Sequence, residues 1–179
     1  MKIMTISALA LVSSMTMAAD YKIDPAHSAV IFKIGHLGVS TTVGRFNEFE
    51  GTFSYPEGSH SGSASLTVKA DSVDTNHEAR DKHLRSPDFL DVKQFPSLTF
   101  KSTKFDGSTL TGDLTLHGVT KAVSFDVKKV GEGKDPWGGY RAGFEAKTTI
   151  QRSDFGVTYF IPGVTDTTEI EVNVEGIRQ

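Results

Sequence analysis

The strongest constraint on the fold of this chain is an alternation of apolar and polar residues that recurs along most of its length. Leu66, Val68 and Ala70, for example, are separated by single polar residues. A period of two places successive side chains on opposite faces of an extended strand, whereas an amphipathic helix repeats about every 3.6 residues. About eight such segments follow one another, most of them joined by short turns. This pattern predicts an all-β chain with antiparallel neighbours.

Two architectures suit such a chain, a closed barrel and a two-sheet sandwich. The predicted inner faces mix large residues with small ones such as Ala64, Gly112 and Ala146, which would leave space along a barrel axis. The last predicted strand is long and regular, so it is suited to pairing with the first. We therefore expect a single antiparallel β-barrel domain over residues 19–179, with room for packed side chains or one small ligand.

The segment from Asp71 to Phe105 interrupts the alternation and contains the part of the chain that is predicted to be helical. Thr75 and Glu78 have the spacing of a capping box, which predicts that Thr75 caps a helix. Ser86-Pro87 has the features of a second helix start, a polar cap followed by proline. We expect this short helical insert to cover one open end of the barrel.

Residues 1–18 have the features of a signal peptide. Lys2 supplies a positive start, residues 3–12 are mostly apolar, and Ala18 ends a run of small residues. The apolar run is too short to span a bilayer as a helix, so we expect cleavage near residues 18/19, export and no stable membrane insertion. An ordinary buried N-terminal helix is the alternative. The chain has no cysteine, which excludes disulfides and cysteine-ligated metals.

Charge and motifs exclude several functions. The net charge is −3 without a basic cluster, which argues against a nucleic-acid partner. The segment from His77 to Asp81 departs from the zinc-protease pattern, because Asp81 stands where a second histidine is required. The carboxylates are dispersed, so we expect no catalytic residue, no metal and no cofactor other than a bound ligand. Two alternatives stay open: an enzyme that acts on an amphiphile held in the barrel, and an exported metal- or haem-binding protein that uses His36, His77 and His83.

The dominant chemical property is an apolar inner face, which either encloses a ligand or fills a solid core. The pattern alone leaves both readings open. The inner-face residues are Val30, Phe32, Ile34, Phe53, Leu66, Val68, Phe100, Leu114, Leu116, Phe125 and Phe144.

Several motifs resemble those of the YceI-like family. The central one is RDKHLRS at residues 80–86, with SVDT at 72–75 before it and Phe95-Pro96 after it. Residues 112–121 are similar as well, although His117 stands where family members more usually have asparagine. The resemblance covers nearly all of the chain after residue 18. It implies an extended, lipocalin-like barrel in the periplasm that holds an isoprenoid or another long-chain amphiphilic lipid, such as a polyprenyl quinone or a polyprenyl phosphate.

With this resemblance, the inner-face residues are expected to hold the isoprenoid tail. Arg80, His83 and Arg85 in the insert are the candidates for contact with the head group. The alternative for these three residues is structural, because each can pair with a nearby carboxylate and so fix the insert to the barrel. Whether two barrels form a homodimer stays open.

Overall fold

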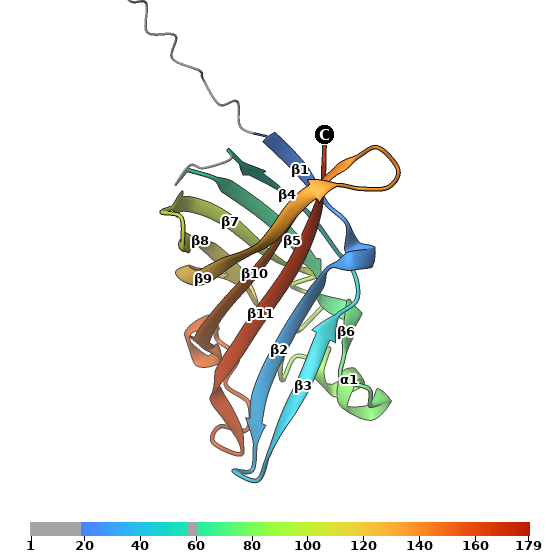
Figure 1. Ribbon diagram of the computed structural model, residues 1–179. Helices are drawn as coiled ribbons and strands as arrows, with labels where there is room; N and C mark the ends of the chain where they lie inside the picture. The colour runs from blue at the N-terminus through green and yellow to red at the C-terminus, as the bar shows by residue number, and fades with distance from the viewer. Residues whose placement is uncertain (1–18, 57–60) are drawn as a thin grey trace, which may run out of the picture.

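The structure is a computed structural model that describes residues 19–56 and 61–179, and these residues form one antiparallel sheet that closes into an eight-stranded barrel (Figure 1). The predicted signal peptide lies outside the described residues. Among the described residues, none of the helices has the length and apolar character needed to cross a membrane. The elements are, in order, β1 (Ala19–Ile23), η1 (Pro25–His27), β2 (Ala29–His36), β3 (Ser40–Phe46), β4 (Phe49–Tyr55), β5 (Ser63–Lys69), η2 (Ala70–Ser72), β6 (Val73–Asp74), α1 (Glu78–Leu84), β7 (Ser97–Phe105), β8 (Thr109–Leu116), β9 (Val119–Lys134), β10 (Tyr140–Gln151), η3 (Arg152–Phe155) and β11 (Val164–Arg178).

The barrel closes between its first and last strands. Tyr21 of β1 lies opposite Arg178 of β11, and β1 also pairs with β4. Further along β11, β2 takes the place of β1, with Phe32 opposite Ile170. The two short strands β1 and β2 therefore pair with successive stretches of the same long strand, β11. The sequence prediction that the long last strand pairs with the first is confirmed.

The barrel interior contains the apolar residues of the alternating segments, as expected. Aromatic rings pack there at close range, with the Tyr21 and Phe53 rings stacked at 4.9 Å between centroids. One expectation about space was wrong. A Cβ atom at Gly112 would lie 2.5 Å from the Phe100 ring, so that ring already occupies the space next to the glycine. Ala64 and Ala146, in contrast, do border a cavity.

The helical insert starts later than predicted. The residue that caps α1 is His77, whose Nδ1 accepts a hydrogen bond from the backbone N–H of Arg80 at 3.2 Å. Thr75 instead donates its backbone N–H and its hydroxyl to the buried Asp81 carboxylate. Asn76 separates Thr75 from the helix with a left-handed backbone, φ 59°. The spacing of Thr75 and Glu78 therefore does not produce a capping box here.

The predicted second helix is also wrong. Between residues 85 and 96 the described chain forms hydrogen-bonded turns rather than a helix. Asp91 has a left-handed backbone with φ 42°, which an α-helix does not accommodate. The N–H of Leu90 bonds to the carbonyl of Leu84, so this turn folds back on the end of α1.

An ion-pair network fixes the closing edge of the barrel. Nη1 of Arg141 on β10 lies 2.8 Å from Asp24 Oδ2 and 2.6 Å from Glu175 Oε1. Its Nε lies 3.1 Å from Asp135 Oδ2. The hydrogen bond from Arg141, assisted by one from His27, lowers the pKa of Asp24 from 3.8 to about 2. The network thus joins the residue after β1 to β10 and β11.

We expect Arg141→Gln to raise the pKa of Asp24 toward 3.8, because the largest cause of its lowering is removed. A depressed carboxyl pKa stabilises the fold above the unfolded pKa, and this stabilisation is lost as the pH falls toward 2. The variant should therefore lose stability already at neutral pH and unfold at a higher pH during acidification. An NMR titration of the Asp24 carboxyl carbon, with exposed Arg45→Gln as control, measures the shift. An unchanged Asp24 titration would contradict this account.

Candidate functional site

Two apolar cavities lie inside the described part of the barrel. The upper cavity is lined by residues that include Ile23 of β1, Tyr55 of β4 and Ala64 of β5, and it has a volume of about 120 Å³. The lower cavity lies toward α1 and has a volume of about 150 Å³. The sequence left open whether the interior is filled. The two cavities show that the core keeps internal space.

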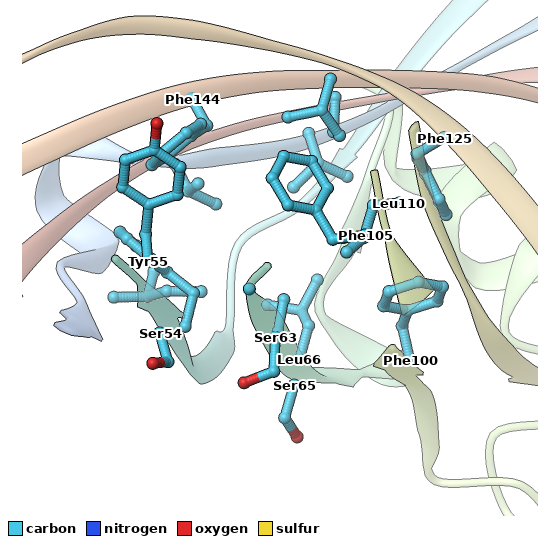
Figure 2. Close-up of a pocket in the computed structure, with 18 residues that line it drawn as sticks. Ser54, Tyr55, Ser63, Ser65, Leu66, Phe100, Phe105, Leu110, Phe125 and Phe144 are labelled. Atoms are coloured by element: carbon cyan, nitrogen blue, oxygen red, sulfur yellow. The ribbon is translucent and has the colours of Figure 1, made fainter. Parts of the chain in front are cut away.

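Aromatic side chains surround the upper cavity. Figure 2 shows the Tyr55, Phe105 and Phe144 rings gathered around it, while the Ser63 and Ser65 oxygens point away from these rings. The alternation of β5 explains this arrangement, because Ser63 and Ser65 occupy outward positions, whereas Ala64 and Leu66 occupy inward positions. The wall of the upper cavity is therefore almost entirely hydrocarbon.

The two cavities share part of their walls. Leu66, Phe100, Phe125 and Val172 line both of them, and we call these four residues the waist. The Phe100 and Phe125 rings meet edge to face with centroids 5.1 Å apart. The waist residues come from β5, β7, β9 and β11, so four strands contribute side chains that the two cavities share.

The insert closes one side of the lower cavity, at the end of the barrel where the sequence predicted a cover. Leu84 comes from α1, and Phe89 and Leu90 come from the turns that follow it. The Phe89 ring also packs edge to face against Tyr159 at 5.3 Å. The cover is therefore itself apolar where it faces the cavity.

All of the predicted tail-binding residues border the cavities. Phe53 and Phe144 line the upper cavity, and Leu66, Phe100 and Phe125 belong to the waist. The others border the lower cavity, and these are Val30, Phe32, Ile34, Val68, Leu114 and Leu116. Their contact with a ligand stays a prediction.

The three head-group candidates lie outside the cavities. In the described part of the chain, neither cavity is lined by Arg80, His83 or Arg85. Arg80 donates to the Thr75 carbonyl at 2.7 Å, and Arg85 donates to backbone carbonyls of residues 71 and 73 at 2.7 Å each. These contacts fix α1 to the chain before it, as expected if the two arginines have a structural role. The acceptors are backbone carbonyls, whereas the sequence analysis expected carboxylates.

Within residues 19–56 and 61–179, His83 is the one candidate of the three with a carboxylate partner. Its Nε2 lies 2.8 Å from Asp88 Oδ2. Its ring packs edge to face against Phe89 at 5.0 Å and Tyr159 at 5.3 Å. His83 therefore supports the aromatic cover from the outside.

The sequence did not identify the buried cation of the lower cavity. Arg152, at the start of η3, is 4% exposed and lines this cavity. Its guanidinium donates to the backbone carbonyls of residues 157, 159, 164 and 165, each at 2.9 Å. Burial lowers the pKa of Arg152, and the charge of Asp166 opposes this change. These carbonyls come from the loop before β11 and from the first two residues of β11, so no local pattern around Arg152 indicates them.

The cavity walls bear on the two alternative functions. Among the described residues, neither wall contains an aspartate, glutamate or histidine that could act as an acid–base pair. In the same part of the chain, the group of ligand-type side chains that converges is Asp24, His27 and Glu175. Arg141 already binds two of these three residues. His36, His77 and His83 do not belong to this group.

A closed barrel that encloses apolar space has the architecture that can hold one small ligand inside. A model of the YceI-like domain family matches residues 21–176 of the chain. The chain therefore belongs to the YceI-like family, as its motifs predicted. A UPF0312 protein of Pseudomonas aeruginosa strain LESB58 is 48% identical over 187 residues, covering 98% of both chains.

Solved structures share the fold. Burkholderia cenocepacia BcnA superposes with a TM-score of 0.76 at 24% identity, covering 86% of this chain and 98% of BcnA. A polyisoprenoid binding domain from Saccharophagus degradans superposes with a TM-score of 0.67 at 15% identity, covering 89% of this chain and 98% of that domain. The predicted antiparallel, lipocalin-like barrel is confirmed.

Proposed function

We propose that this protein is a periplasmic carrier that binds a polyisoprenoid or another long-chain amphiphilic lipid inside its barrel. The observation that carries the proposal is the pair of apolar cavities that meet at the waist. The polyisoprenoid-binding neighbour supports the same ligand class. Carriage rather than catalysis fits walls that, in the described chain, contain no aspartate, glutamate or histidine.

The cavity volumes limit how much of a tail fits without movement. A dry cavity of about 150 Å³ holds a benzene-sized molecule, so each cavity accepts a short hydrocarbon segment. A longer tail requires the waist side chains to rotate and join the cavities. Each five-carbon isoprene unit would contribute roughly 4 kcal/mol before binding costs, at about 0.8 kcal/mol per CH₂. Tail length should therefore dominate affinity.

The proposal is tested with delipidated protein and polyprenyl quinones of increasing tail length. We expect affinity to rise with each added isoprene unit until the lumen is filled, and then to stop rising. Isothermal titration calorimetry should show the negative heat-capacity change of apolar burial. A head group without a tail is the control and should bind weakly. Equal affinity for all tail lengths, or binding of the head group alone, would contradict the proposal.

The proposed location is tested separately. We expect the protein in the periplasmic fraction, with an intact mass that lacks residues 1–18. A cytoplasmic protein that retains residues 1–18 would contradict the location and leave the lipid-binding test unaffected.

A further inference from the structure

A buried hydroxyl in the lower cavity has no partner in the protein. Thr168 Oγ1 is inaccessible to solvent and accepts or donates no hydrogen bond, and it is the one such side-chain atom within residues 19–56 and 61–179. Thr168 also belongs to the wall of the lower cavity. Buried polar atoms in folded proteins are almost always hydrogen-bonded, so this exception calls for an explanation.

The neighbours of Thr168 explain why the protein supplies no partner. On β11, Thr168 lies directly opposite Ile150 of β10 on one side and Ile34 of β2 on the other. Neither isoleucine side chain can accept or donate a hydrogen bond. The two other threonines nearby behave differently, because Thr165 donates to a backbone carbonyl at 2.9 Å and Thr167 donates to the Gln151 amide oxygen at 3.3 Å.

The positive charge of Arg152 in the cavity wall indicates what kind of ligand atom would form a hydrogen bond with the Thr168 hydroxyl. Arg152 lies in the same wall, and its Cζ is 5.9 Å from the centre of the Phe89 ring. A buried guanidinium favours an electron-rich oxygen nearby, and a threonine hydroxyl can donate one hydrogen bond to it. The hydrogen bonds that Arg152 forms use four of its five N–H donors. A full anion would need several free donors when buried, so the site suits a neutral acceptor.

We propose that Thr168 donates a hydrogen bond to a neutral acceptor oxygen of the bound lipid, such as a quinone carbonyl that enters the lower cavity. This inference rests on the proposed lipid-binding function and deepens it. It assigns the polar contact to the inside of the barrel, at a residue of the cavity wall, and not to Arg80 and Arg85, which line neither cavity. The apolar walls hold the tail, and Thr168 distinguishes an oxygen-bearing end from plain hydrocarbon.

The test compares Thr168→Val with wild type, using a prenylated benzoquinone and a terpene hydrocarbon of similar size. Valine keeps the shape of threonine and removes the hydroxyl. We expect the affinity for the quinone to fall about fivefold to tenfold, the effect of one hydrogen bond, and the affinity for the hydrocarbon to stay within about twofold. The ligand-free variant should unfold at a higher temperature than wild type, because an unsatisfied buried hydroxyl is gone.

Two further variants make the result specific. Thr167→Val removes an exposed hydroxyl from the adjacent position and should leave both affinities unchanged. Thr168→Ser keeps the hydroxyl and should keep the preference for the quinone. The infrared carbonyl stretch of the bound quinone should lie at lower frequency in wild type than in Thr168→Val, because a hydrogen bond weakens the C=O bond.

Each other outcome overturns the inference in a recognisable way. An unchanged quinone affinity in Thr168→Val would mean that another group binds the oxygen. An equal loss for quinone and hydrocarbon would mean that Thr168 acts through packing alone. If wild type binds neither ligand, the proposed function itself fails, whereas tight binding of both without preference rejects only the role of Thr168.

Discussion

Replacing Phe125 with aspartate is expected to reduce the affinity for a polyisoprenoid lipid at least about 100-fold. Phe125 is 6% exposed, belongs to the waist and lines both cavities. A carboxylate there would be buried without a partner, which costs several kcal/mol, and a tail that crosses the waist would have to pass it. The readouts are the lipid that copurifies per mole of protein and the dissociation constant for rebinding.

The chain offers a matched control on the same strand. Val130 of β9 is 64% exposed, so Val130→Asp makes the same kind of change on the outside of the barrel and should leave lipid binding unchanged. Phe125→Leu removes the ring without adding charge and should keep most of the binding. Circular dichroism identifies which variants are folded. A folded Phe125→Asp protein that retains lipid at the wild-type level would mean that the ligand does not cross the waist.

Replacing Arg152 with methionine is expected to lower the free energy of unfolding by about 3–5 kcal/mol. The substitution leaves four backbone carbonyls between residues 157 and 165 without the donor that they share, a guanidinium whose residue is only 4% exposed. In a domain of this size the loss corresponds to a decrease in melting temperature of roughly 6–20 °C.

Thermal and urea unfolding measure this effect, and exposed Arg178→Met serves as the control because Arg178 lies at the surface beside Tyr140. The control should change the free energy of unfolding by less than about 0.5 kcal/mol. A loss below about 1 kcal/mol in Arg152→Met would show that the loop carbonyls find other donors and that Arg152 is not required to hold them.

The alternation of side chains predicted the barrel because it is a local signal with a direct geometric consequence. The turn at Asp106-Gly107 joins β7 to β8 as a hairpin, as its sequence indicates. Alternation also assigned the inward face of each strand, which is why Phe53, Phe100 and Phe144 all border cavities. These features depend on neighbours within a few residues.

The features that the sequence did not reveal depend on distant segments or on single backbone angles. Arg152 is buried because the loop after η3 and the start of β11 place four backbone carbonyls around its guanidinium. The left-handed backbone at Asn76 prevents a helix from starting after Thr75, where the residue types alone predicted a start. The left-handed backbone at Asp91 interrupts the second helix that the residue types predicted. Thr168 is in phase with Ile170 on the inward face of β11. Because its side chain is polar, the alternation of apolar residues did not predict that it lines the cavity.

His117, where the resemblance led us to expect asparagine, lies at a position with an unusual backbone angle. It precedes Gly118 in the turn between β8 and β9, and both residues have positive φ values, 52° and 73°. Asparagine adopts this left-handed conformation more readily than most residues, and histidine is also enriched there. Histidine is therefore compatible with this turn, and its presence does not by itself indicate a function.

The most direct test of the lipid-carrier account is organic extraction and mass spectrometry of the protein purified from its native periplasm without detergent. The account predicts one polyisoprenoid lipid per barrel, with an oxygen-bearing head group and a tail long enough to occupy both cavities. An empty protein that also fails to take up polyprenyl quinones in vitro would contradict the account.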